Sequence, residues 1–181
     1  MKRVFLALEL PDNLRAALTV QQFLLPLPRR VAPETLHLTL VFLGDTPLPV
    51  LEAVHEAWQA LRLPALEVQV QGFGLFGGAR PRLCYAALRP NPALMALQAK
   101  VETAARRAGA TPEARRFVPH ITLGRFSPPP PEQLFRLERA VVAGADFAPP
   151  PFEVREMVLY ESHLGGASAR HDPLARYPFS V

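Results

Sequence analysis

The feature that most constrains the fold is that the sequence passes through the same order of segments twice. Residues 3–18 (RVFLALELPDNLRAAL) and 82–97 (RLCYAALRPNPALMAL) both read as an apolar strand, a proline, an N-cap and a helix. Asp12 and Asn91 are the expected N-caps, because short polar side chains satisfy free N–H groups at helix starts. A period this long predicts two similar lobes, since solenoid repeats are shorter.

Both helices show an apolar face at helical spacing. The residues expected on these faces are Leu14, Leu18, Gln21 and Leu25 in the first helix, and Leu94, Leu97, Val101 and Ala105 in the second.

Each helix leads through an arginine-containing loop to a short strand with the pattern His-x-Thr-x. The two copies are HLTL (37–40) and HITL (120–123), which begin 83 residues apart. Arginines 29–30 and 115–116 lie in the two loops, where they predict either an RNA-backbone contact or a solvated surface.

The parallel continues after the two motifs. Residues 44–61 and 127–142 each predict a proline-led helix, the first capped by Thr46, and residues 64–70 and 150–160 predict strands. Residues 71–82, rich in glycine and arginine, are expected to form the hairpin loop that joins the lobes.

These segments predict a β-α-β-α-β unit that occurs twice. We expect an α+β fold with two pseudo-symmetric lobes, whose antiparallel or mixed sheets are flanked by helices. A parallel sheet is disfavoured, because the units lack the glycine-rich phosphate turn that often accompanies one. The whole chain, 1–181, is expected to be one domain, with an internal duplication of approximately 1–78 and 79–181.

Composition narrows the functional classes. The single cysteine, Cys84, excludes an intramolecular disulfide and a thiolate zinc cage. No apolar run reaches the roughly 18 residues of a membrane span, and no signal peptide is apparent, so a cytoplasmic protein is expected. The net charge of +4, carried almost entirely by arginine, fits a nucleic acid or phosphorylated partner, although coding bias or heat adaptation explains it equally well.

The two motifs together predict a reactive site. Side chains alternate along a strand, so His37 and Thr39 share one face, and His120 and Thr122 share the equivalent face. In-line displacement at phosphorus needs a base and an acid on opposite sides, and histidine serves either role near neutral pH. The threonine hydroxyls can bind the non-bridging oxygens, and Arg125 is the nearest residue to offset the developing charge.

This scheme requires no metal or other cofactor, and it predicts a bell-shaped pH profile. Packing alone remains an alternative for the histidines, and so does a non-catalytic RNA-binding module whose histidines only contact phosphate. A mononuclear metallohydrolase is disfavoured, because threonine is a poor ligand and no carboxylate lies at ligand spacing from either histidine.

The chain resembles the two-histidine (2H) phosphoesterase superfamily, and within it the 2′-5′ RNA ligase family of RNA 2′,3′-cyclic phosphodiesterases. The resemblance rests on RVFLALELP, LHLTLVFLG, FVPHITLGR and LYESHL, in the family's order. It implies a cleft between two lobes, hydrolysis of a terminal 2′,3′-cyclic phosphate to a 2′-phosphate, and reversible 2′-5′ joining of RNA ends. It also implies that His37 donates a proton to the leaving 3′ oxygen, that His120 accepts one from water, and that Thr39 and Thr122 hold the phosphate.

The expected partners are RNA ends, including tRNA halves, or cyclic nucleotides, bound by a monomer. One departure from the family is His171, which occupies the place of a usual aromatic residue in the tail. The other singled-out residues are expected to be structural or to line the rim of the cleft, with base stacking as the alternative for the aromatic ones: His55, His163, Phe42, Phe73, Phe76 and Tyr85.

Overall fold

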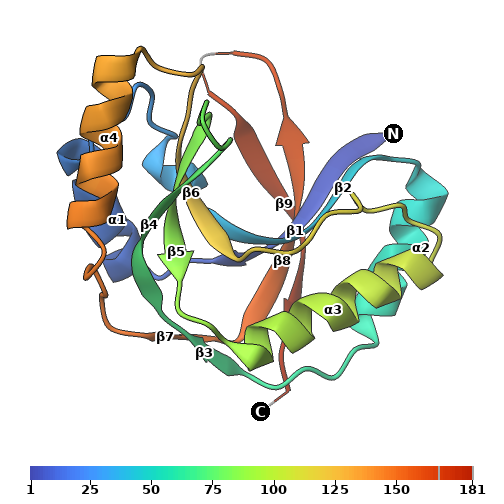
Figure 1. Cartoon of the computed structure of the whole chain (residues 1–181). Coiled ribbons are helices and arrows are strands. Elements are labelled where there is room, and N and C mark those ends of the chain that lie inside the picture. The colour runs from blue at the N-terminus through green and yellow to red at the C-terminus, as the bar shows by residue number, and fades with distance from the viewer. Residues whose placement is uncertain (167, 181) are drawn as a thin grey trace.

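Seven strands form one antiparallel sheet in the order β4-β5-β6-β2-β1-β8-β9, and β3 and β7 form a separate two-stranded ribbon (Figure 1). The computed structural model describes residues 1–166 and 168–180. The strands are β1 (Lys2–Glu9), β2 (His37–Thr46), β3 (Leu66–Val68), β4 (Val70–Phe76), β5 (Leu83–Leu88), β6 (His120–Arg125), β7 (Phe152–Val154), β8 (Glu156–His163) and β9 (Arg170–Pro178). The helices are α1 (Asp12–Leu24), α2 (Leu48–Gln59), α3 (Pro92–Arg107) and α4 (Pro131–Ala143), with a 3₁₀ turn at Pro33–Thr35.

The large sheet is nearly divided in two between β2 and β6. These strands share a single register pair, Leu38 with Ile121, whereas β1 and β2 pair along most of their length. We call the two parts the three-stranded sub-sheet (β4, β5, β6) and the four-stranded sub-sheet (β2, β1, β8, β9). The expected α+β fold with two lobes is therefore confirmed, with antiparallel pairing throughout the large sheet.

Each sub-sheet combines strands from the two predicted halves of the chain. β4 of the first half pairs with β5, and β8 of the second half pairs with β1, so neither sub-sheet is built from one half alone. The predicted repeat boundary near residue 78 falls in the turn between β4 and β5, and it stays a prediction.

The interpretation of residues 71–82 as a loop is wrong for its first half, which continues β4 to Phe76. Its glycines serve the strand. Gly72 has φ +72° and lies in an irregularity of the β4–β5 ladder. Gly74 lies against the Tyr85 ring, where an added Cβ would come within 2.4 Å. Glycine inside a strand commonly marks such bulges and close approaches, so a glycine-rich stretch was a poor predictor of a loop here.

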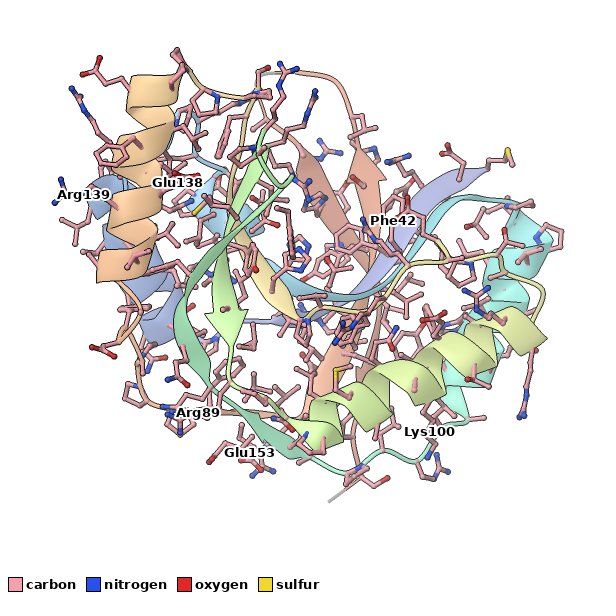
Figure 2. The ribbon with its side chains drawn as sticks, in the orientation of Figure 1. Phe42, Arg89, Lys100, Glu138, Arg139 and Glu153 are labelled. Atoms are coloured by element: carbon pink, nitrogen blue, oxygen red, sulfur yellow. The ribbon has the colours of Figure 1, made fainter. Side chains whose placement is uncertain are left out.

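The helices cover the sheet from outside. α1 packs on β6 and α4 on β4, whereas α3 packs on β2 and α2 on β9 (Figure 1). Arg139 on α4 and Lys100 on α3 point away from the sheet (Figure 2). No helix in the described part of the chain is long and apolar enough to cross a membrane.

The predicted helix faces are confirmed with one exception. In α3 all four expected residues are buried, but in α1 the buried glutamine is Gln22 instead of Gln21. Asn91 is the N-cap of α3 and accepts a hydrogen bond from the Leu94 N–H at 3.1 Å. The expected caps at Asp12 and Thr46 are wrong, because Pro11 and Pro47 occupy the cap positions of α1 and α2. Asp12 is the first residue of α1. Thr46 ends β2, and its hydroxyl donates to the Gly44 carbonyl.

We expect Trp58→Phe to lower the free energy of unfolding by about 2–3 kcal/mol, because it removes a buried hydrogen bond and leaves a cavity. Trp58 on α2 is 1% exposed, and its indole N–H donates to the Val101 carbonyl of α3 at 2.9 Å. Urea denaturation measures the loss. Phe135→Leu is the control, because Phe135 is 59% exposed and should change stability by less than about 0.5 kcal/mol. Equal stability of the Trp58 variant and the wild type would contradict this packing.

Candidate functional site

The two His-x-Thr-x segments meet at the divide between the sub-sheets. The motif leucines and isoleucine are buried, whereas His37, Thr39, His120 and Thr122 are partly exposed on the other face. In antiparallel pairing about Leu38 and Ile121, each histidine lies opposite the threonine of the other strand. The alternation predicted from the sequence is thus observed in both strands, and it places all four polar side chains on one face.

These four side chains line one cleft of about 550 Å³, together with Arg125. The cleft lies where β2 and β6 diverge after their single pair. The structure therefore brings together all five residues that the sequence singled out for the site.

Both imidazole rings are held in the same way. The Nδ1 atom of His37 lies 2.5 Å from the Thr35 carbonyl oxygen, and that of His120 lies 2.8 Å from the Val118 carbonyl oxygen. A carbonyl can only accept a hydrogen bond, so Nδ1 carries the proton in each ring. The Nε2 atom is then free to accept or donate a proton. In His37 it lies 3.0 Å from the Thr39 hydroxyl oxygen.

Burial favours the neutral form of both rings. Burial lowers the pKa of His37 from 6.5 to about 4, against the raising effect of its hydrogen bond to Thr35. Burial also lowers the pKa of His120, again opposed by its backbone hydrogen bond. The positive charge of Arg125 lowers the pKa of both histidines further.

The cleft is strongly basic. Its described lining includes five arginines and one carboxylate, Glu113, which pairs with Arg115 at 3.2 Å. Burial and the charge of Arg115 lower the pKa of Arg125. The Arg125 side chain forms no hydrogen bond or ion pair within residues 1–166 and 168–180, so its donors remain available to an anion. The arginines of the cleft are Arg3, Arg29, Arg30, Arg115 and Arg125.

The loop before β2 is fixed against β6. The Val31 N–H donates to the Leu123 carbonyl at 3.0 Å, and a Cβ on Gly124 would come within 2.4 Å of the Arg29 carbonyl oxygen. Glycine at position 124 therefore permits a close backbone approach that brings Arg29 and Arg30 to the cleft. Of the two arginine pairs noted in the sequence, Arg116 lines an adjoining pocket of about 330 Å³ instead.

Aromatic rings surround each catalytic candidate. Phe5 and His171 lie 4.9 Å and 5.4 Å from His37, measured between ring centroids. Phe76 and Tyr85 lie 5.0 Å and 5.5 Å from His120. His171, the departure from the family pattern, is therefore a third imidazole in the cleft, and burial lowers its pKa.

The remaining singled-out residues divide between the cleft and the rest of the fold. Phe42 lines the cleft beneath the Arg3 guanidinium, whereas Phe73 stacks on Phe147 elsewhere. His55 Nδ1 lies 2.8 Å from the Tyr177 hydroxyl, in agreement with a structural role.

His163 lies 2.9 Å from an Asp172 carboxylate oxygen and lines a second cavity next to His37. Three or more histidine, cysteine, aspartate or glutamate side chains arranged to hold a metal ion do not occur within the described residues.

Comparison with known proteins agrees with this geometry. The model of the 2′-5′ RNA ligase superfamily matches residues 10–166. The RNA 2′,3′-cyclic phosphodiesterase of Geobacillus stearothermophilus is 30% identical over 161 residues, which are 85% of this chain but only 48% of that protein. The chain thus spans about half the length of that relative. The RNA 2′,3′-cyclic phosphodiesterase of Escherichia coli K12 is 28% identical over 97% of this chain and 96% of its own length.

The fold has solved counterparts. The crystal structure of E. coli LigT complexed with 3′-AMP superposes with a TM-score of 0.81 at 26% identity, and covers 99% of both chains. Other crystal structures of LigT hold phosphate, ATP and NADP+. From the family match, the paired motifs and this likeness, the chain belongs to the 2′-5′ RNA ligase superfamily.

Proposed function

We propose that this protein is an RNA 2′,3′-cyclic phosphodiesterase, which opens a terminal 2′,3′-cyclic phosphate to a 2′-phosphate. The observation that carries the proposal is the matched pair of imidazoles, each with Nδ1 fixed on a carbonyl and each lining one basic cleft with a threonine. The names of the Geobacillus and E. coli relatives support the same reaction.

In the proposed step, His120 Nε2 accepts a proton from water as the water oxygen attacks phosphorus. The bond between phosphorus and the 3′ oxygen breaks, and His37 Nε2 donates its proton to that oxygen. Thr39 and Thr122 donate hydrogen bonds to the non-bridging oxygens, and Arg125 offsets their charge. The product carries a 2′-phosphate and a 3′-hydroxyl, and proton exchange with solvent resets the two rings.

The donor role requires that His37 gain a proton, although burial lowers its pKa to about 4. A bound phosphodiester adds a negative charge beside the ring, which favours the imidazolium. His37 therefore becomes the acid when the substrate binds, whereas both histidines favour the neutral form in the free enzyme.

The same geometry serves the joining reaction. If the 5′-hydroxyl of a second RNA end replaces water, the identical displacement forms a 2′-5′ phosphodiester. The proposed partners are thus RNA ends, including tRNA halves, or small cyclic nucleotides, bound by a cytoplasmic monomer. Nucleotide complexes of LigT support a nucleotide-binding cleft here.

His37→Ala and His120→Ala should each lower kcat/KM on a 2′,3′-cyclic nucleotide by about 10²-fold or more, since each removes one proton-transfer group. Thr39→Val and Thr122→Val should each lower kcat/KM by about 10- to 10²-fold, because each removes one hydrogen-bond donor to the phosphate. The assay is carried out in excess EDTA, and the products are identified by chromatography.

His55→Ala is the matched control, because His55 contacts Tyr177 outside the cleft, and it should keep wild-type activity. Full activity in either cleft-histidine variant would overturn the assignment. Binding of RNA ends without turnover by the wild type would instead favour a non-catalytic binding module.

The lowered pKa values predict where the pH profile lies. One group must be protonated and the other neutral, so kcat/KM should follow a bell. Both histidines of the free enzyme titrate below 6.5, so the centre of the bell should lie below pH 6.5. Measurement of kcat/KM from pH 4 to 8.5 tests this, and a bell centred above pH 7 would contradict the electrostatics described for the cleft.

A further inference from the structure

Two of the few buried polar side chains occupy matching places in the fold. Gln22 on α1 is 1% exposed and Gln98 on α3 is 7% exposed. Thr46 is the other buried polar side chain recorded for the described residues. A buried amide costs free energy unless its donors are bonded, and a leucine would fill the same space without that cost. Their burial therefore calls for a role beyond packing.

Each glutamine forms a hydrogen bond with the motif strand on which its own helix packs. The Gln22 side-chain amide donates to the Leu123 carbonyl of β6 at 2.9 Å, directly after Thr122. The Gln98 side-chain amide lies 3.4 Å from the Leu40 carbonyl of β2, directly after Thr39. The first-half helix thus holds the second-half motif, and the second-half helix holds the first-half motif.

The two carbonyls belong to matching irregularities of the sheet. The β1–β2 register passes from Thr39 to Val41 and leaves Leu40 without a partner residue. The β5–β6 register passes from Thr122 to Gly124 and leaves Leu123 without one. A bulge re-aims the side chains beside it, and such bulges occur near active sites.

The NH2 group of each glutamine donates two hydrogen bonds. The Gln22 NH2 group donates its second hydrogen bond to the Val31 carbonyl at 2.9 Å, in the basic loop before β2. The Gln98 NH2 group donates its second to a Glu102 carboxylate oxygen at 2.6 Å. Gln22 therefore joins the β6 bulge to the loop before β2, whereas Gln98 joins the β2 bulge to its own helix α3.

We propose that Gln22 and Gln98 are positioning residues, which fix the bulges after the two threonines and so set the aim of His120 and His37 across the cleft. This inference rests on the proposed function for its effect on turnover, but the geometry it requires can be measured without substrate.

The test uses Gln22→Met and Gln98→Met, which keep the side-chain volume and remove the donors. Histidine ring signals in ¹H–¹⁵N NMR spectra should show a crossed pattern: Gln22→Met shifts His120 more than His37, and Gln98→Met shifts His37 more than His120. On a 2′,3′-cyclic nucleotide, Gln98→Met should lower kcat by about tenfold or more, with KM changed less than about threefold, since small misplacements of catalytic groups are costly.

Leu14→Ala and Leu97→Ala are the controls, because they truncate buried residues on the same two helices. They should destabilise the protein at least as much while leaving the histidine signals and kcat near wild type. If the glutamine variants keep kcat near wild type, as the controls should, or if the crossed pattern is absent, the inference fails. An inactive wild type with the crossed pattern would overturn the proposed function and leave this positioning role intact.

The wild type provides a second measurement should either variant fail to fold. The side-chain NH2 protons of both glutamines should exchange with solvent far more slowly than those of the partly exposed Gln21. Exchange as fast as that of Gln21 would overturn the proposal.

Discussion

The site depends on how little β2 and β6 pair. Their single register pair, Leu38 with Ile121, joins the two sub-sheets and fixes which residues face one another. Had the pairing continued, the strands would have closed the sheet and left no space between the sub-sheets. Because they diverge after one pair, the polar faces of both strands open onto a cleft, while the apolar faces remain in the core.

The charged residues of that cleft favour the binding of anions. Several arginines converge on it with one carboxylate, so an anion is attracted before any specific contact forms. Burial, together with the same positive charge, lowers the pKa of both imidazoles and favours their neutral form. In the proposed mechanism, the negative charge of the bound phosphodiester raises the pKa of His37 and lets it act as the acid.

The buried and polar faces of the site-forming elements could be predicted from the sequence, because they depend on local periodicity. The alternation in HLTL and HITL predicted the faces of both strands, and the spacing in 92–107 predicted the buried face of α3. The extension of β4 to Phe76 was missed because the glycines of residues 71–82 resemble a loop, although they serve a bulge and a close approach to Tyr85. Non-local contacts leave no periodic signal, so the exchange of strands between sub-sheets was also hidden.

The glutamines illustrate the same limit. Helical spacing favoured Gln21 for the face of α1, yet Gln22 is the buried one, because its partner is a carbonyl 101 positions away in the chain. A polar residue in a core position carries no pattern that distinguishes it from a surface residue. The place of His171 beside His37 was indicated only by resemblance, and the 5.4 Å separation of the rings comes from the fold.

The most direct test of the central claim is a long-range ¹H–¹⁵N NMR spectrum of histidine-labelled protein at pH 7, recorded during titration with a nucleoside 2′-phosphate. If His37 and His120 form one site with Nδ1 fixed on carbonyls, both rings should be neutral with the proton on Nδ1 in the free protein. Both should then change at the same nucleotide concentration, with one bound nucleotide per chain. Protons on Nε2, or a response of only one of the two rings, would contradict the account.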